Sequence, residues 1–331
     1  MEKIRIGVIG TGHLGRLHTK MFSQNDKCVL TGVFDEDFEK ANKVATEFNT
    51  KQFESMNNLL NNVDAVSIAV TTSAHYNVAK AAFNAGKSVF IEKPVTALIN
   101  EAEELVKTAS ELGLVFQVGH IERFNPALLA VEKYNLMPLF IQSDRLAQFN
   151  PRGTDVAVVL DLMIHDIDII LSLIKSEVKS VSANGVGVVS KHIDIANCRI
   201  EFENGAVAVV TASRISQKKM RKMRIFQSDS YIALDFNSGV AEVFRLAPVL
   251  GEIPAGTISY GEIGIGELAK RVVYEQPEVF EINALEHELK LFVEAVENKS
   301  KPVVSGEDGL RALRVANMII EKIEESARKF N

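Results

Sequence analysis

The sequence is poor in the features that mark secreted proteins. Its 331 residues contain only two cysteines, Cys28 and Cys198, which lie far apart in apolar, strand-like surroundings. We therefore expect two buried free thiols, no disulfide, no metal-binding cysteine pattern, and a reducing cytoplasm as the location. The first predicted strand begins almost at residue 1, so no signal peptide is expected.

Long apolar runs and an excess of positive charge are also lacking. The longest strongly apolar stretch, 156–174, is interrupted by aspartates and a histidine, which argues against a membrane span. The net charge is −6 and the isoelectric point is about 5.8, so neither nucleic acid nor a membrane is expected as a partner. The remaining composition, 47% hydrophobic and 24% charged, is typical of a globular protein with room for two domains.

A glycine-rich turn follows the first apolar strand and precedes an amphipathic helix. In its G-x-G-x-x-G pattern, Gly10 permits a tight turn, Gly12 leaves room for a pyrophosphate, and Gly15 lets the helix lie close to the strand. The N–H groups at the start of the helix would bind the pyrophosphate. The predicted dinucleotide-binding segment is Gly10, Thr11, Gly12, His13, Leu14 and Gly15.

An acidic residue completes this motif. The second strand ends in Asp35, twenty residues after Gly15, where a carboxylate can accept hydrogen bonds from a ribose diol. Glu36 and Asp37 follow it, and this acidic cluster would repel a 2′-phosphate. The sequence therefore favours NAD over NADP as the cofactor, with Lys40 and Lys43 as the nearest cations. The alternative is an ordinary glycine turn with a helix-capping aspartate.

Strand and helix patterns alternate through the first 120 residues, as a doubly wound parallel sheet requires. We predict an α/β protein whose residues 1–120 form a dinucleotide-binding Rossmann domain. Residues 121–331 are predicted to form an α+β substrate-binding and oligomerisation domain with a largely antiparallel open sheet. Its last helix, 306–329, can pack back onto the first domain. Because an open sheet face needs cover, a homo-oligomer, either a dimer or a tetramer, is expected.

Within the second domain, the predictions are a helix over 126–134, a long helix over 156–174 and a series of strands. The turns at 203–205 and 237–239 are typical of hairpins. The segment 247–266 contains proline and glycine and is predicted to be a loop. The chain closes with helices over 284–298 and 306–329.

Glu92-Lys93-Pro94 directly follows a predicted buried strand. The carboxyl ends of parallel strands hold ligands in doubly wound folds, so Lys93 is expected to point into the cofactor crevice. There it could donate a hydrogen bond to a reacting oxygen or orient it. The bond before Pro94 can be cis. Taken alone, such a lysine is more typical of a solvated strand end.

The long helix predicted over 156–174 is apolar except for Asp161, His165, Asp168 and Ser172, while Asp166 lies off their stripe. Offsets of four, seven and eleven put the four residues on one stripe of an α-helix, which we expect to face a wet cleft or polar partners. His165, with a carboxylate one turn away, is suited to act as a general base. A core histidine paired with an aspartate fits the same pattern.

Two further segments are candidates for binding a polar substrate. Arg123 and Asn125 lie at the expected hinge between domains, although Asn125-Pro126 is equally typical of a helix N-terminus. The segment Arg214–Arg224 holds six cations and no acid, which could bind a phosphate-bearing substrate or could be a solvated hairpin. Arg145 and Arg152 could extend the same basic wall.

Together these motifs resemble the Gfo/Idh/MocA family of NAD(P)-dependent oxidoreductases over almost the whole chain. The resemblance rests on the glycine turn, on Glu92-Lys93-Pro94, and on Asp161-x-x-x-His165 with Asp168. It implies hydride transfer between a sugar or cyclic polyol carbon and nicotinamide, with Lys93 and His165 at the reacting hydroxyl and Asp161 beside them. It also implies that Thr71, His75 and Glu92 line the cofactor, although the family's Thr-Pro lacks its proline here.

Within the family, the runs 120–126, 160–168 and 211–216 are similar to those of UDP-N-acetylglucosamine 3-dehydrogenases. This similarity implies oxidation of a nucleotide sugar to its 3-keto form. The substrate contacts would then be Arg123, Asn125, Asp161, His165, Asp168 and Arg214. Alternatives are an inositol or free-sugar dehydrogenase and a non-catalytic NAD-binding sensor or regulator. The presence of both Lys93 and His165 argues against the sensor.

Overall fold

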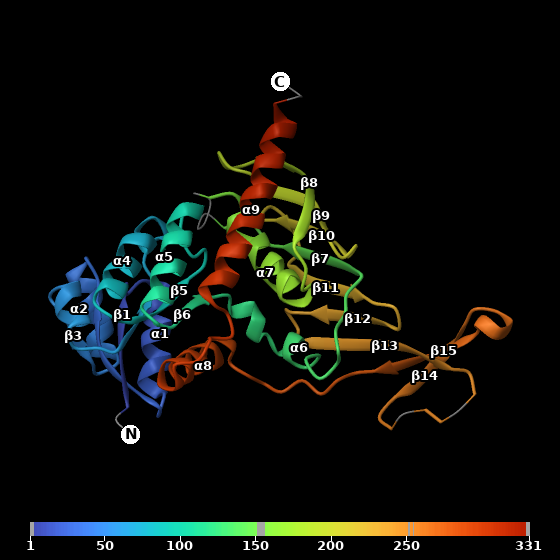
Figure 1. Cartoon of the computed structure of the whole chain (residues 1–331), viewed down its shortest axis with the longest axis horizontal. Helices are drawn as coiled ribbons and strands as arrows, with labels where there is room; N and C mark the ends of the chain where they lie inside the picture. The colour runs from blue at the N-terminus through green and yellow to red at the C-terminus, as the bar shows by residue number, and fades with distance from the viewer. Residues whose placement is uncertain (1–2, 151–155, 251, 254, 329–331) are drawn as a thin grey trace. The chain divides into compact units, whose positions relative to one another are not determined.

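The computed structural model describes residues 3–150, 156–250, 252–253 and 255–328, which fall into two compact units (Figure 1). The first unit comprises Met1–Ile121 and Asn283–Arg314, and the second comprises Glu122–Ile282 and Val315–Asn331. Arg152 and the predicted helix end at Lys329 lie outside the described residues. In the described part of the chain, no helix is long and apolar enough to cross a membrane.

The first unit is built on a six-stranded sheet. Its strands are β1 (Ile4–Ile9), β2 (Cys28–Phe34), β3 (Lys51–Gln52), β4 (Ala65–Ile68), β5 (Ser88–Glu92) and β6 (Phe116–Gly119). They are all parallel and follow the order β3-β2-β1-β4-β5-β6, which is the doubly wound order of dinucleotide-binding domains. The predicted Rossmann fold is therefore confirmed.

The helices of this unit bury the apolar strands between them. They are α1 (His13–Gln24), α2 (Phe38–Glu47), α3 (Met56–Leu60), α4 (Thr72–Asn84), α5 (Ile99–Glu111) and, from far along the chain, α8 (Ala284–Asn298). Leu289, Phe292 and Val293 of α8 are buried in one core with Ile6 and Phe22. Division of the chain at residue 120 assigned α8 to the second domain, but its apolar stripe packs against β1 and α1. Helix α9 (Gly306–Ala327) contributes to both units.

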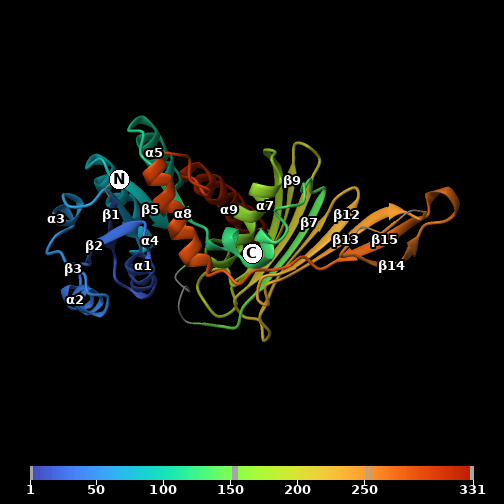
Figure 2. The ribbon, with the colours of Figure 1, turned by 90° about the horizontal axis from the view of Figure 1, so that it is seen from below.

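The second unit is built on a nine-stranded sheet. Figure 2 shows this sheet from below. Its strands are β7 (Phe140–Leu146), β8 (Val178–Val186), β9 (Ile195–Phe202), β10 (Val207–Ser213), β11 (Met220–Phe226), β12 (Ser230–Asp235), β13 (Val240–Pro248), β14 (Ile258–Ile263) and β15 (Lys270–Glu275). The order is β14-β15-β13-β12-β11-β7-β10-β9-β8, and of these neighbours β7 and β10 pair in parallel while the others are antiparallel. The predicted, largely antiparallel sheet is confirmed.

One face of this sheet, which we call the inner face, packs against short helices. These are η1 (Ile121–Phe124), α6 (Pro126–Leu129), the π-helical segment η2 (Val159–Met163) and α7 (Ile164–Leu173). Helix α7 contacts β7 and β10, while α6 contacts β12 and β13. Strand alternation buries Ile141, Ser143 and Arg145 of β7 on this inner face.

The opposite face, the outer face, carries a row of aromatic side chains across six neighbouring strands. Ring centroids of successive residues lie 4.8–5.9 Å apart. We call this set the aromatic row: Phe140, Phe226, Tyr231, Phe244, Tyr274 and Tyr260. Each of these side chains keeps part of its surface accessible in the single chain. The row is therefore an apolar band on a sheet face that is still open to solvent.

Three local predictions differ from the structure. The segment 247–266 was predicted to be a loop, but it contains β14 and the end of β13. All residues of β14 are exposed, so no alternation of apolar and polar residues marks the strand. The helix predicted over 126–134 ends at Leu129. The single helix predicted over 156–174 begins with the π-helical segment η2 before α7.

Candidate functional site

The glycine turn between β1 and α1 has the shape that a bound pyrophosphate needs. Gly10 has φ +89°, and a Cβ on it would lie 2.6 Å from the Ala69 carbonyl oxygen. A Cβ on Gly15 would lie 1.8 Å from the Gly10 carbonyl oxygen, so only glycine allows this close approach of α1. A Cβ on Gly12 would meet nothing within 4 Å. The open space therefore lies where the motif places the pyrophosphate, and no side chain caps the start of α1.

Asp35 lies at the carboxyl end of β2 and is fixed to this turn. Its Oδ2 accepts hydrogen bonds from the Thr11 backbone N–H at 2.6 Å and from Thr11 Oγ1 at 2.9 Å. Its Oδ1 accepts the backbone N–H of Asp37 at 2.9 Å. A carboxylate has about four acceptor positions, so capacity for a ribose hydroxyl remains. His13 and Leu14 are exposed beside the turn.

Lys40, a nearby cation, is already paired. Asp37 caps α2 by accepting the Lys40 backbone N–H, and its carboxylate lies 2.8 Å from Lys40 Nζ. The side-chain hydrogen bond from Lys40 lowers the pKa of Asp37 below its ordinary value. The Asp37 carboxylate beside Asp35 is therefore ionised at neutral pH. Its negative charge would repel the 2′-phosphate of NADP, so the site fits NAD better.

The remaining predicted cofactor residues divide into exposed and buried ones. Thr71 is exposed at the N-terminus of α4, and Lys93 directly follows β5 at the carboxyl edge of the sheet. The Lys93–Pro94 peptide bond is cis. His75 is buried and contacts backbone carbonyls, and the Glu92 carboxylate contacts His18. The contacts of His75 with Pro94 and of Glu92 with His18 thus lie on either side of Lys93.

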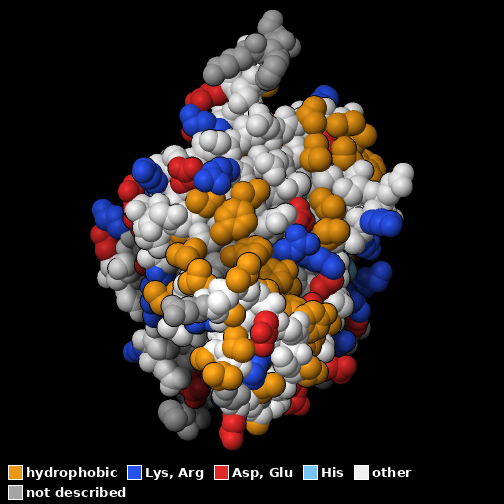
Figure 3. All heavy atoms as spheres, turned by 90° about the vertical axis from the view of Figure 1, so that its right-hand side faces the viewer, with side chains coloured by type: hydrophobic (Ala, Val, Ile, Leu, Met, Phe, Trp, Pro, Cys, Tyr) orange, Lys and Arg blue, Asp and Glu red, His pale blue; other side chains and the backbone are white. Residues whose placement is uncertain are grey.

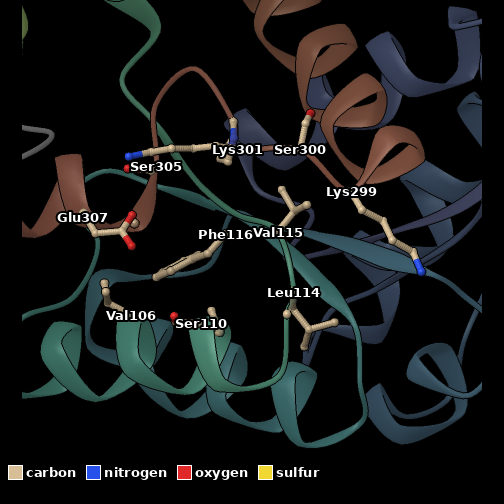
Figure 4. A pocket seen from close by; sticks show the side chains of 14 residues that line it. Val106, Ser110, Leu114, Val115, Phe116, Lys299, Ser300, Lys301, Ser305 and Glu307 are labelled. Carbon is tan, nitrogen blue, oxygen red and sulfur yellow. The ribbon is translucent and has the colours of Figure 1, made fainter.

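A pocket of about 280 Å³ opens elsewhere in the first unit. Its lining includes Leu114 and Phe116 at the start of β6 and Lys301 and Ser305 ahead of α9 (Figure 4). This is the amino-terminal edge of the parallel sheet. Ligands of doubly wound folds bind at the carboxyl edge, so this pocket is distinct from the dinucleotide site.

In the second unit, the predicted stripe of polar residues is broken by the π-helical segment. A π-helix forms hydrogen bonds five residues apart, so a spacing of four no longer ensures that two residues share a face. Asp161 lies in η2 and His165 in the first turn of α7, and both are half-buried. Asp168 is fully buried, and Ser172 Oγ donates to the Ile169 carbonyl oxygen at 2.6 Å. The four residues therefore do not form one wet stripe.

Asp168 is bound by Arg123, so two predicted substrate residues are partners of each other. Arg123 Nε and Nη2 donate to the two carboxylate oxygens of Asp168 at 2.6 and 2.8 Å. Asn125 caps α6 by accepting the Ala127 N–H, and its amide group donates to Glu122 and to the Phe236 carbonyl oxygen. The helix-terminus alternative for Asn125 is therefore the one that the structure shows.

A buried charge cluster beneath α7 was missed in the sequence. Arg145 Nε and Nη2 donate to the Asp166 carboxylate at 2.6 and 3.2 Å, and Arg145 Nη1 donates to Glu122 at 2.8 Å. Ser143 Oγ also donates to Asp166, and Arg221 Nη1 lies 3.2 Å from the Glu122 carboxylate. Arg145 is only 2% exposed. Burial alone would lower the pKa of Arg145, but the two carboxylates raise it above its ordinary value.

The signals for this cluster were weak in the sequence. Asp166 was recognised as lying off the polar stripe of an apolar helix, and an acid in that position needs a buried partner. Arg145 occupies an inward-facing position of β7, which contradicts its assignment to an exposed basic wall. Recognising both required knowledge of which strand lies beneath the helix.

The predicted basic segment is likewise split by strand alternation. Arg214 is buried, donates to the Val156 carbonyl oxygen at 2.7 Å and lies 3.8 Å from the Asp194 carboxylate. On β11, Lys222 and Arg224 fall on the outer face, near Asp235 and Gln142 respectively. Arg221 falls on the inner face, where α7 lies. The six cations therefore do not form a single wall.

Comparisons with known proteins agree with this architecture. The oxidoreductase family model with an NAD-binding Rossmann fold matches residues 4–120, and the GFO/IDH/MocA C-terminal domain model matches residues 140–233. The chain is 37% identical over 329 residues to a UDP-N-acetylglucosamine 3-dehydrogenase from Acidithiobacillus ferrooxidans, with 98% of each protein covered. A solved structure of that enzyme from the same organism has a TM-score of 0.87 at 35% identity, covering 98% of this chain and 99% of the other. A myo-inositol 2-dehydrogenase from Thermotoga maritima is 25% identical over 341 residues, 97% of each protein.

The doubly wound sheet, the glycine turn and the acid after β2 define an NAD-binding oxidoreductase. The chain belongs to the Gfo/Idh/MocA family and is an NAD-dependent dehydrogenase acting on a CH–OH group. The family resemblance seen in the sequence is thereby confirmed.

Proposed function

We propose that the chain oxidises UDP-N-acetylglucosamine, or a closely similar UDP-linked N-acetylated hexose, at the hydroxyl of ring carbon 3. The observation that carries this proposal is the 37% identity to a UDP-N-acetylglucosamine 3-dehydrogenase along 98% of both proteins. Identity over the full length includes both the cofactor unit and the sheet unit. The myo-inositol 2-dehydrogenase relative, at 25% identity, leaves a polyol as the alternative substrate to be tested.

Lys93 and His165 are proposed to act on the same substrate hydroxyl. His165 takes the hydroxyl proton as the hydride leaves the adjacent carbon, Lys93 donates a hydrogen bond to the reacting oxygen, and Asp161 orients the imidazole. Bound nicotinamide supplies the hydride acceptor. Removing a general base typically lowers the rate by about a hundredfold to ten-thousandfold, so His165→Asn should lose most turnover while NAD still binds. Near-normal turnover would assign His165 to a structural role.

The cofactor is proposed to bind along Gly10–Gly15 with its adenine ribose on Asp35. The orientation of the Asp35 carboxylate toward Thr11 and the pairing of Lys40 with Asp37 support this proposal. Titration calorimetry should give a lower dissociation constant for NAD than for NADP, and Asp35→Ala should reduce the difference. Equal affinities for the two dinucleotides in the wild-type protein would contradict the role of Asp35.

Arg221 is the proposed contact for the substrate diphosphate. Its side chain is 48% exposed and lies on the face of β11 toward α7, and its Nη1 lies 3.2 Å from the Glu122 carboxylate. Arg224 lies on the same strand but on the opposite face, so it is a matched control. Charge-assisted hydrogen bonds contribute about 1.5–3 kcal/mol, which predicts a tenfold to hundredfold rise in KM for Arg221→Gln. Arg224→Gln should leave KM unchanged.

The substrate assay follows NADH absorbance with UDP-N-acetylglucosamine, free N-acetylglucosamine and myo-inositol. The proposed function requires the nucleotide sugar to have a much higher kcat/KM than either free compound. Equal turnover of myo-inositol would favour the polyol dehydrogenase. Tight NAD binding with no turnover of any of the three would favour the sensor. Arg214 is buried, so in this proposal it has a structural role and does not contact the substrate.

The aromatic row is proposed to be covered by a second copy of this chain, giving a dimer or a tetramer. Figure 3 shows hydrophobic side chains gathered on the side of the molecule that carries the end of the sheet. Ile258, Ile263 and Ile265 of the β14 region are exposed large hydrophobic residues. Monomeric proteins seldom expose large contiguous apolar patches. Light scattering should give a multiple of 36.5 kDa, and Phe226→Lys should lower it. Leu112→Lys, on the first unit, is the control.

The cytoplasm is the proposed location, because both cysteines are free and buried in the folded chain. A reducing compartment would keep both thiols in this state. Fractionation of the producing cells with an antibody to the protein tests the proposal.

A further inference from the structure

A buried histidine, His18 of α1, contacts the residue that precedes Lys93. His18 Nε2 lies 3.0 Å from Glu92 Oε1, and His18 Nδ1 lies 2.8 Å from Ser67 Oγ. The His18 side chain is completely buried, and its ring packs edge-on against Phe90. These contacts join α1, whose first residues form the dinucleotide turn, to the end of β5.

A second buried histidine contacts the residue that follows Lys93. His75 of α4 has Nδ1 at 2.9 Å from the Pro94 carbonyl oxygen and Nε2 at 3.3 Å from the Val70 carbonyl oxygen. Burial lowers the pKa of His75, so the ring is neutral at physiological pH and carries one N–H. We assign that proton to Nδ1, which makes the shorter contact. His75 thereby ties the Pro94 backbone to the start of α4.

We propose that His18 and His75 are positioning residues, which together clamp the segment Glu92–Pro94 and fix the direction of Lys93. This inference rests on the proposed function of Lys93 at the reacting hydroxyl. Both histidines belong to helices that begin at the carboxyl edge of the sheet, α1 at the glycine turn and α4 beside Thr71. The clamp therefore sets Lys93 relative to the elements that bind the dinucleotide. A misplacement of about 1 Å at a reacting group can cost a hundredfold in rate.

Glu92 is suited to its part in the clamp because it stays ionised. Burial would raise the pKa of the Glu92 carboxyl, but the hydrogen bond from His18 and the charge of Lys93 keep it below its ordinary value. The ionised carboxylate then lies 3.0 Å from His18 Nε2. Neither His18 nor His75 needs to touch the substrate in this arrangement.

The two histidines can be tested by substitution with glutamine or asparagine, each of which places an amide nitrogen near the position of one ring nitrogen. The amide nitrogen of glutamine can replace a histidine Nε2, and that of asparagine can replace Nδ1. His18 works through Nε2 toward Glu92, so His18→Gln should be tolerated and His18→Asn should not. His75 works through Nδ1 toward Pro94, so His75→Asn should be tolerated and His75→Gln should not. His192, exposed on the β8–β9 turn, provides the control His192→Gln.

Three measurements are made on each variant: kcat and KM, the NAD dissociation constant, and deuterium exchange of the backbone segment 89–96. In the two disfavoured variants we expect kcat to fall about tenfold to a hundredfold, KM to change less than about twofold, and exchange to accelerate within 89–96. The favoured variants and His192→Gln should keep wild-type values. Exchange that accelerates across the whole first unit would indicate a purely structural role and would overturn the proposal.

An equal loss of kcat in the asparagine and glutamine variants, at either position 18 or position 75, would also overturn the proposal. It would show that the position of the nitrogen does not matter. The exchange measurement does not depend on the substrate. If UDP-N-acetylglucosamine is not turned over by the wild-type protein, the proposed function fails, but the selective change in 89–96 still decides whether the clamp exists. If Lys93→Met retains turnover while the clamp variants lose it, positioning of Lys93 is refuted.

Discussion

Helices α1 and α7 carry residues of the proposed site, and the two units fix these helices by different means. In the first unit, α1 is held by close backbone contact at Gly10 and Gly15 and by the contacts of His18 with Glu92 and Ser67. In the second unit, α7 is held by two arginines that each bind an aspartate through two nitrogens. The position of α1 therefore depends mainly on close packing of the backbone, and the position of α7 depends mainly on buried ion pairs.

This difference follows from what each unit must bind. A pyrophosphate is recognised by backbone N–H groups, which require the main chain to come close and side chains to be absent. The role of proton acceptor proposed for His165 requires a fixed side-chain direction. Paired charges beneath a helix supply this, because their geometry is specific even when their net contribution to stability is small. We therefore expect the first unit to be sensitive to added volume and the second to loss of one charge.

The largest expected effect is on the charge cluster. Arg145→Met leaves Asp166 and Glu122 buried without their main partner, and breaking a buried pair in this way costs about 3–5 kcal/mol. Urea denaturation followed by circular dichroism measures the free energy of unfolding; the chain contains no tryptophan for fluorescence. The control is Arg199→Ala, which removes an exposed pair with Glu201 and should leave stability unchanged within error. Equal effects of the two substitutions would show that the cluster does not stabilise α7.

The next effect concerns pH and the turn beside β9. Asp194 accepts the backbone N–H groups of Val188, Val189 and Ser190. Although burial raises its pKa, the bonds from Ser190 and the neighbouring N–H groups hold it well below the ordinary value. Asp194→Asn should therefore cost about 1.5–3 kcal/mol at pH 7, the size of a charge-assisted hydrogen bond.

The sign of the pH dependence is fixed by this depressed pKa. The stabilisation is complete above the unfolded pKa near 3.9 and is lost as pH falls through the lower folded pKa. The stability difference between the wild type and Asp194→Asn should be constant from pH 8 to pH 5 and should shrink below about pH 4. A difference that grows on acidification would contradict the assignment.

The sequence was most informative where the structure depends on local backbone geometry. Gly10, Gly12 and Gly15 lie within six residues, so their spacing alone predicted the turn, and Asp35 followed from the length of one helix and one strand. The hairpin turns at Gly205 and Gly239, both with positive φ, were predicted for the same reason. Such features depend on neighbours in the sequence.

Prediction was poorest where partners come from distant segments. Arg145 and Asp166 are 21 residues apart, and Arg221 and Glu122 are 99 apart. Strand order decides whether such residues meet, and the sequence does not contain it explicitly. The same limitation explains why Arg145 and Arg214 were assigned to substrate phosphates: a basic residue pointing inward from a strand cannot be told from one pointing outward without the register. The apolar pattern of residues 156–174 predicted one continuous helix and did not reveal the π-helical segment η2.

A smaller effect separates the two glycines of the turn. Gly15→Ala forces a Cβ against the Gly10 carbonyl oxygen and should destabilise the free protein by about 1–3 kcal/mol, as overpacking does. Gly12→Ala meets no protein atom within 4 Å, so the free protein should keep its stability while NAD binding weakens. Thermal unfolding with and without NAD distinguishes the two. Loss of stability in Gly12→Ala without NAD would mean that the open space is filled by the protein itself.

The smallest effect uses the two buried thiols as reporters, because Cys28 lies in the first unit and Cys198 in the second. Burial raises the pKa of Cys28 to about 11 and that of Cys198 to about 12, so little thiolate forms at pH 8 and labelling by a disulfide reagent requires local opening. NAD at ten times its dissociation constant stabilises the conformation that binds it by about 1.4 kcal/mol. Labelling of Cys28 should then slow about tenfold, while labelling of Cys198 should not change. Equal slowing of labelling at both thiols would show that the two units open together. The two units would then differ only in the local contacts that hold α1 and α7.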